Sequence, residues 1–188
     1  MKKKILERYR QTAEGHINID ISAGRIEDLY NNFDRLSPYV KKELDPELVE
    51  YLIDSVSEIG RREFIITFHL TAGSDDYLLS RVRTSIRNYF LYLKELEKKA
   101  LAQMIRRSLI YLSIGCVIFS VTLWINQQFD GPKGVFISIL SEGLTVASWV
   151  SFWQALANFI INWSPHRGKI VLYQRIACAA VEFKMQNK

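Results

Sequence analysis

The sequence predicts an α+β membrane protein, in which a transmembrane helical hairpin of two spans is joined to a small cytoplasmic α+β domain of three strands. Three observations predict this fold class. Two long apolar stretches are separated by a short polar turn, three segments alternate apolar and polar residues, and the basic residues gather on one side of the apolar stretches. The predicted organisation is an α+β domain (residues 1–75), a long linker helix (76–107), the hairpin (108–163), and a tail helix and strand that join the soluble domain (164–188).

The α+β domain is expected to open with a strand. Isoleucine alternates with polar residues over residues 16–22, which is the period of a strand with one buried face. Residues 25–34 are expected to form a short helix or an irregular arm. Asp45 and Pro46 predict a helix start, because aspartate can accept the free amide groups and proline suits the first helical position. Gly60 is typical of the C-terminal end of such a helix.

A second strand and a long helix are expected next. Alternation over residues 64–70 puts the aromatic and aliphatic side chains on one face and His69 on the other. The helix that follows can be capped by Ser74 or Asp75 and has no stop signal before the first span. Its first two turns are expected to pack on the sheet. Its apolar residues follow the 4-3 spacing of a heptad seam: Val82, Ile86, Tyr89, Leu93, Leu96 and Ala100.

The hairpin prediction follows from length and charge. Residues 108–129 contain no charged side chain, and about 20 apolar residues at ~1.5 Å per residue cross a hydrocarbon core of roughly 30 Å. Residues 134–163 contain one acid, Glu142, and residues 130–133 form the turn. Beyond the second span, residues 169–178 are expected to form a short separate helix. Residues 180–185 alternate again, so we expect them to complete the soluble domain as its third strand.

The charge distribution predicts the location. A net charge of +5 could indicate a nucleic-acid partner, but the basic residues flank the spans while the turn holds Lys133 as its one basic residue. This positive-inside pattern predicts a multi-pass protein of the inner (plasma) membrane with both termini cytoplasmic and the lipid bilayer as partner. No nucleic-acid partner and no cleavable signal peptide are expected. Cys116 and Cys178 suggest a reducing compartment. The expected anchors at the inner interface are Arg106, Arg107, Trp163 and Arg167.

Several short motifs resemble an uncharacterised group of bacterial two-span inner-membrane proteins with a small cytoplasmic α+β domain. The resemblance implies the architecture and the bacterial inner membrane, and it implies no activity. Gln154 departs from the group, which has a basic residue there, and Gly168 and Ile170 interrupt a longer arginine run. The motifs are Ser37-Pro38, Leu44-Asp45-Pro46, Glu142-Gly143-Leu144, the Trp149 and Trp153 pair, and Trp163-x-Pro165-x-Arg167.

The second span carries a polar stripe, which falls within an arc of roughly 120° on a helix. Polar groups are disfavoured against lipid, so the stripe should face protein or water. It either packs, against the small residues of the first span or against another copy, or it lines a pore. Glu142 is expected at the outer interface, where it would be hydrated. The stripe is Ser148, Ser151, Gln154, Asn158 and Asn162, and the small packing residues of the first span are Ser113, Cys116 and Ser120.

Two function classes follow. One is a membrane-anchored structural or signalling module that self-associates through the second span and whose cytoplasmic domain binds a protein partner. The other is an oligomeric ion channel or membrane-permeabilising effector lined by the polar stripe. We expect no enzyme, no catalytic or metal-binding residues and no cofactor, because the sequence holds no phosphate-binding loop and its histidines lack metal spacing. A site assembled only by the fold would be an exception.

Overall fold

The computed structural model describes residues 7–12, 15–34, 38, 42–71, 75–128 and 134–185. The chain divides into two compact units. We call residues 1–96 and 169–188 the sheet unit, and residues 97–168 the hairpin unit. The expected turn at residues 130–133 and the candidate cap Ser74 lie outside the described residues.

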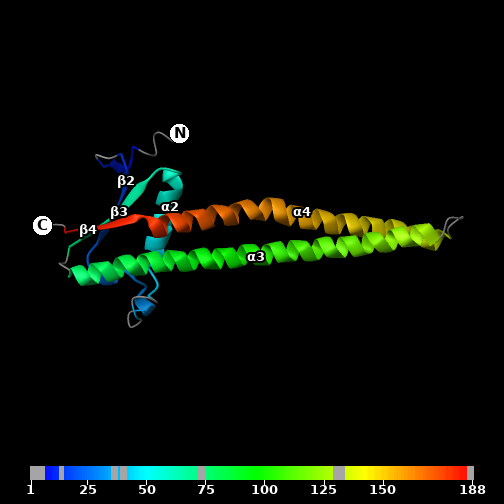
Figure 1. Ribbon diagram of the computed structural model, residues 1–188, viewed down its shortest axis with the longest axis horizontal. Coiled ribbons are helices and arrows are strands. Elements are labelled where there is room, and N and C mark those ends of the chain that lie inside the picture. The colour runs from blue at the N-terminus through cyan, green and yellow to red at the C-terminus, as the bar shows by residue number, and fades with distance from the viewer. Residues whose placement is uncertain are drawn as a thin grey trace. The chain divides into compact units, whose positions relative to one another are not determined.

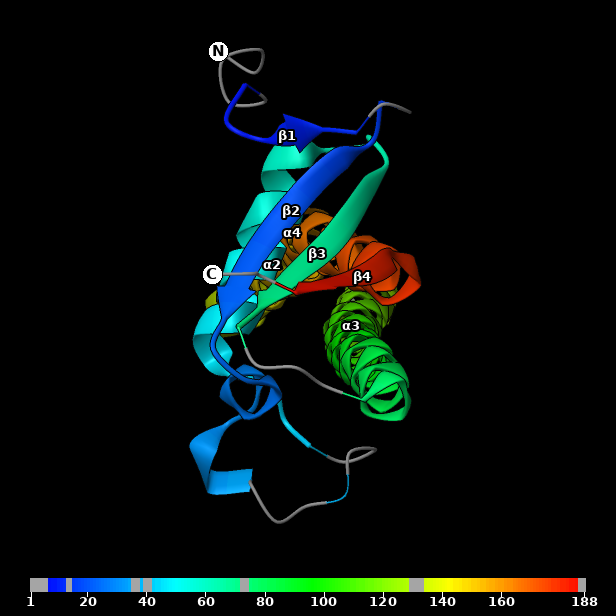
Figure 2. The ribbon, with the colours of Figure 1, turned by 90° about the vertical axis from the view of Figure 1, so that its left-hand side faces the viewer.

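The sheet unit contains a four-stranded mixed sheet in the order β1-β2-β3-β4 (Figure 2). The three long strands are parallel to one another, and the short β1 pairs antiparallel with β2. The expected count of three strands is therefore wrong, because β1 is only two residues long and too short to show any alternation. The strands are β1 (Arg10–Gln11), β2 (Ile17–Ala23), β3 (Phe64–Leu70) and β4 (Ala180–Met185).

Helix α2 (Pro46–Ile59) connects β2 to β3 and has the ends that the sequence predicts. The Asp45 carboxylate accepts hydrogen bonds from the amides of Glu47, at 2.9 Å, and Leu48, at 3.3 Å. Gly60 ends the helix at a φ of 72°, a conformation that disfavours side chains. The expected short helix or irregular arm over residues 25–34 consists of two 3-10 turns, η1 (Ile26–Leu29) and η2 (Asn32–Asp34).

The core of the sheet unit lies on one face of the sheet, where the helices pack (Figure 2). All the side chains that the alternation of β3 assigns to this face are buried. The first turns of α3 cover it, as expected, and the end of α4 covers it together with α2. The residues at its centre are Ile19, Leu52, Val56, Ile66, Phe68, Val82, Ile86, Phe90 and Ile176, each at most 1% exposed.

Two long helices follow β3. Helix α3 (Asp76–Gln128) has 53 residues, and α4 (Val135–Cys178) has 44. The expected separate helix over residues 169–178 is wrong, because Pro165 lies inside α4 and residues 169–178 continue the same helix. Proline lacks an amide N–H, so the helix loses about one backbone hydrogen bond at this position. The helical hydrogen bonds can continue on either side of it. Strand β4 starts two residues after α4 ends and pairs in parallel with β3.

Candidate functional site: a polar groove in the hairpin unit

The two helices of the hairpin unit run antiparallel (Figure 1) and meet along small residues spaced seven apart. This is the period of a helix–helix seam. Gly115 shows how closely the side chains of α4 approach the backbone of α3: an added Cβ would lie 2.7 Å from Cε1 of Phe152 and 3.2 Å from Cβ of Ser151. The buried seam residues are Ser108, Gly115 and Thr122 on α3, and Ser141, Ser148 and Ala155 on α4.

The small residues that the sequence analysis assigned to helix packing lie outside this seam. Ser113, Cys116 and Ser120 are exposed on α3. The Ser113 hydroxyl donates to the Leu109 carbonyl at 2.9 Å, and the Ser120 hydroxyl donates to the Cys116 carbonyl at 2.8 Å. Within one chain, therefore, they do not form the face that packs on α4. The seam residues Ser108, Gly115 and Thr122 lie in the same charge-free stretch. Ser113 and Ser120 are also seven residues apart, so spacing in the sequence does not distinguish the two faces.

The polar stripe of α4 divides into two parts. Ser148 is fully buried in the seam, and its hydroxyl donates to the Leu144 carbonyl at 2.9 Å. Ser151 is half-buried and donates to the Ala147 carbonyl at 3.0 Å. Both serines thus satisfy their donors within their own helix. The three amide side chains of the stripe, Gln154, Asn158 and Asn162, line a groove further along α4.

This groove has a volume of about 470 Å³ and lies between α3 and α4. Helix α3 contributes Gln103, Arg107 and Tyr111, and α4 adds His166 to the three amide side chains. The amide of Asn162 donates to Asn158 Oδ1 across 3.5 Å, at the long limit for a hydrogen bond. The lining thus combines one guanidinium with several neutral donors and acceptors.

A hydrogen bond joins the helices beside the groove. Nδ1 of His166 lies 2.6 Å from Oε1 of Glu97, and the two side chains are 27% and 15% exposed. The contact fixes the imidazole that borders the groove. Sequence reasoning treated His166 as a scattered surface histidine, because its partner is 69 positions away.

The remaining predicted site residues lie at the surface of the hairpin unit. Glu142 and Arg106 are exposed, while Arg107 borders the groove. The Trp163 ring stacks on Phe159, with the ring centroids 5.7 Å apart. The Arg167 guanidinium lies 4.8 Å from the centroid of the same tryptophan ring. Trp163 and Arg167 therefore form one contact cluster.

The helix-free face of the sheet carries a polar network. Oδ1 of Asp20 accepts a hydrogen bond from Asn18 at 2.7 Å and lies 2.8 Å from Nε2 of His69. Thr67 donates to Oδ1 of Asn18 at 2.7 Å. These bonds explain why His69 faces away from the core, as the alternation predicts.

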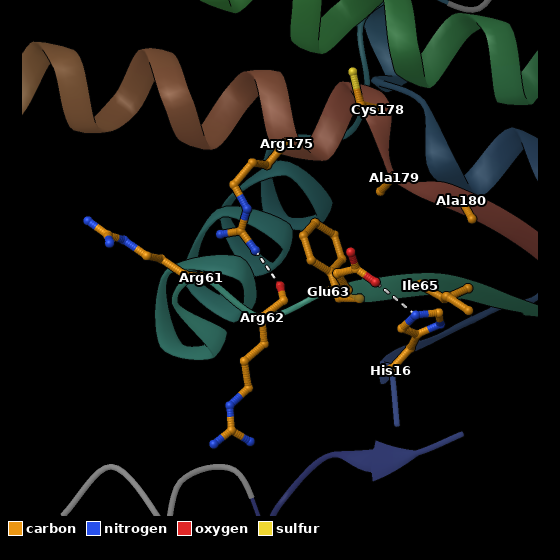
Figure 3. Close-up of a pocket in the computed structure, with 10 residues that line it drawn as sticks. His16, Arg61, Arg62, Glu63, Ile65, Arg175, Cys178, Ala179 and Ala180 are labelled. Atoms are coloured by element: carbon orange, nitrogen blue, oxygen red, sulfur yellow. Dashed lines mark hydrogen bonds and ion pairs between the residues drawn. The ribbon is translucent and has the colours of Figure 1, made fainter. Parts of the chain in front are cut away.

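A second pocket, of about 430 Å³, lies at the edge of the sheet where the parallel strands begin (Figure 3). Arg175 of α4 points into it and donates to the carbonyl of Arg62 at 2.6 Å and to that of Gly60. His16 lies 2.9 Å from Glu63 at the opposite side. The Arg175 guanidinium therefore binds carbonyls at the C-terminal end of α2, where cations are favoured, and serves the fold.

Burial shifts the pKa values of three side chains in the sheet unit. It raises the pKa of Tyr89, with a smaller contribution from the negative charge of Glu43. It also raises the pKa of Tyr9, whose hydroxyl donates to Glu58 at 2.8 Å. Burial lowers the pKa of Arg175. None of the three lines the hairpin groove.

The described residues contain no group of three or more histidine, cysteine, aspartate or glutamate side chains that could hold a metal ion. The described residues form an α+β fold. Two of its helices are long and apolar enough to cross a membrane. No protein-family model, curated protein or solved structure matches the chain.

Proposed function

We propose that the chain is a two-span protein of a bacterial inner membrane, in which residues 108–163 form the membrane-embedded hairpin. Both termini lie in the cytoplasm, and the protein acts as a self-associating structural or signalling module. Its sheet unit is the cytoplasmic interaction domain, and the helix-free polar face of the sheet is available to a protein partner. The proposal assigns no catalytic activity to the described residues.

The observation that carries this proposal is the apolar surface of the hairpin helices. Only 17% and 11% of the residues in the most apolar 18-residue stretches of α3 and α4 are buried within the chain. Val117, Phe136 and Ile161 are 63%, 78% and 68% exposed. Transfer of one such side chain out of water stabilises a protein by about 1.5–3 kcal/mol. So many exposed apolar side chains are best explained by a lipid environment.

The orientation follows from the charges at the ends of this surface. Arg106 and Arg107 precede the apolar part of α3, and Arg167 and Lys169 follow that of α4. Basic residues are retained on the cytoplasmic side of bacterial spans. The helix ends that carry these four residues therefore belong in the cytoplasm.

We place self-association on the exposed small residues of α3 instead of on the second span, because part of the polar stripe of that span is buried within one hairpin. Ser113, Cys116 and Ser120 offer a second copy a surface on which two backbones can approach closely. The pore alternative is less well supported, because Ser148 is fully buried inside one hairpin and cannot line a channel between copies.

Cysteine labelling tests the topology. In a Cys116→Ala, Cys178→Ser background, single cysteines replace Ile5, Gly131 or Asn187. We expect an impermeant maleimide added to intact cells to label only position 131. Labelling of either terminus from outside would refute the orientation, and loss of the protein from the membrane fraction after carbonate extraction would refute the spans.

Cross-linking through the native Cys116 tests self-association, with Cys178→Ser as background. We expect an oxidant to yield a covalent dimer in membranes. Ser113→Leu together with Ser120→Leu should reduce its yield, whereas Val121→Leu, at a 44% exposed position on another face of the helix, should leave it unchanged. Equal yields in all three proteins would refute association through this face.

A further inference from the structure

We propose that the groove between α3 and α4 binds the phosphate headgroup of an anionic glycerophospholipid. This inference rests on the proposed membrane location. It assigns a ligand to the polar side chains that the sequence analysis attributed to packing or to a pore.

The chemistry of the groove lining favours an anionic ligand. Arg107 offers a planar guanidinium, the side chain best suited to bind phosphate oxygens in pairs. Gln154, Asn158 and Asn162 each add an amide donor from the opposite helix. None of the described lining residues is acidic, and the nearby Glu97 carboxylate already contacts His166. An anion is therefore the ligand that this set of donors favours.

The groove is large enough for a headgroup, and its amide side chains can rearrange around one. A volume of about 470 Å³ lies within the roughly 300–1,000 Å³ typical of small-molecule sites. The Asn162 to Asn158 hydrogen bond is long, at 3.5 Å, so little is lost when these amides turn toward a ligand. The His166 imidazole is already held by its 2.6 Å contact with Glu97, so this wall of the groove is preorganised.

The groove also lies at the end of the charge-free stretch of α3. Arg107 directly precedes the charge-free stretch of α3, so the groove lies at the level where headgroups meet the hydrocarbon. Exposed apolar side chains flank it on both helices, with Ile110 49% and Ile160 62% exposed. A lipid can place its phosphate in the groove and its acyl chains on these side chains. A free phosphate ion gains only the first of these interactions, so the lipid is favoured.

The test uses the full-length protein reconstituted in phosphatidylcholine vesicles that contain a minor fraction of phosphatidylglycerol. After gentle extraction, native mass spectrometry measures the ratio of retained phosphatidylglycerol to phosphatidylcholine. We expect enrichment of phosphatidylglycerol on the wild type. Arg107→Gln should lower the enrichment about tenfold, because it removes a charged hydrogen-bonding partner of the phosphate. Asn158→Leu should lower it without any change in charge.

The matched control is Arg106→Gln. It removes the same charge one position earlier, from an exposed side chain that does not line the groove. We expect it to retain the wild-type enrichment. Equal losses in the Arg106 and Arg107 variants would overturn the proposal, because general surface charge would then explain the enrichment. Unchanged enrichment in both Arg107→Gln and Asn158→Leu would overturn it as well.

Two further measurements separate the alternatives. Excess inorganic phosphate should not displace phosphatidylglycerol, and full displacement would assign the groove to a free anion instead of a lipid. Flotation of every variant with the vesicles reports membrane insertion independently. A wild type that fails to float would refute the proposed membrane location, whereas a wild type that floats without lipid enrichment would refute only the lipid site.

Discussion

Replacement of Ile176 by alanine tests whether the C-terminal segment belongs to the core of the sheet unit. The Ile176 side chain is 1% exposed and lies in the same hydrophobic cluster as Phe68 and Phe90. The substitution removes three buried carbon atoms, each contributing about 0.8 kcal/mol by transfer from water. A cavity term brings the expected loss in the free energy of unfolding to about 3 kcal/mol.

Hydrogen exchange followed by mass spectrometry measures this loss locally, in the peptides that contain β2 and β3. Since every 1.4 kcal/mol is a factor of ten, the most protected β3 amides should exchange on the order of 100-fold faster in Ile176→Ala. Tryptophan fluorescence would not report this loss, because all four tryptophans lie within the hairpin unit.

The matched control is Val171→Ala on the same helix, where the side chain is 58% exposed. We expect less than about a threefold change in exchange, because exposed substitutions usually alter stability by no more than ~0.5 kcal/mol. If Ile176→Ala and Val171→Ala gave the same β3 exchange rates, the end of α4 would not contribute to this core, and our account of the sheet unit would be wrong.

Two further substitutions test the hairpin seam and the half-buried phenol of Tyr89. Gly115→Val should weaken the contact between α3 and α4 by about 1–3 kcal/mol, because the added side chain overpacks against Phe152. The control is Gly143→Val, whose added side chain meets open space. Unfolding in SDS, followed by tryptophan fluorescence, compares the two variants, and equal unfolding midpoints would contradict the seam. Burial raises the pKa of Tyr89, so the folded state favours the neutral phenol. The stability that comes from this preference is fully present below about pH 10 and is lost as the pH rises through the folded-state pKa. Thermal unfolding between about pH 8 and 11 should show a smaller alkaline loss in Tyr89→Phe than in the wild type, and parallel curves would contradict the burial effect.

The sequence was sufficient for the local features of the fold. Asp45, Pro46 and Gly60 define the ends of α2 through backbone chemistry that acts over a few residues. The alternation of β3 likewise identifies its buried face, because a strand with one covered face must alternate. Such features need no knowledge of distant partners.

The features that sequence reasoning missed depend on distant contacts or on very short elements. Strand β1 exists because Arg10 and Gln11 pair with β2, and two residues carry no period of their own. Residues 169–178 do not form the expected separate helix, because α4 continues through Pro165. The groove combines Arg107 with Asn158 and His166 from a separate helix, and only the antiparallel pairing of the two helices brings them together.

The parallel pairing of β3 with β4 has a consequence for biosynthesis. The ribosome makes β3 early and β4 only after both hairpin helices, and Arg175 reaches the Gly60 carbonyl from 115 positions away. Until β4 emerges, one edge of the apolar β3 has no strand beside it, and open edges of this kind promote aggregation. The nascent chain therefore completes its sheet only after the hairpin has been synthesised. A premature stop codon anywhere in α4 would yield a truncated protein with an open strand edge, which is prone to aggregation and proteolysis.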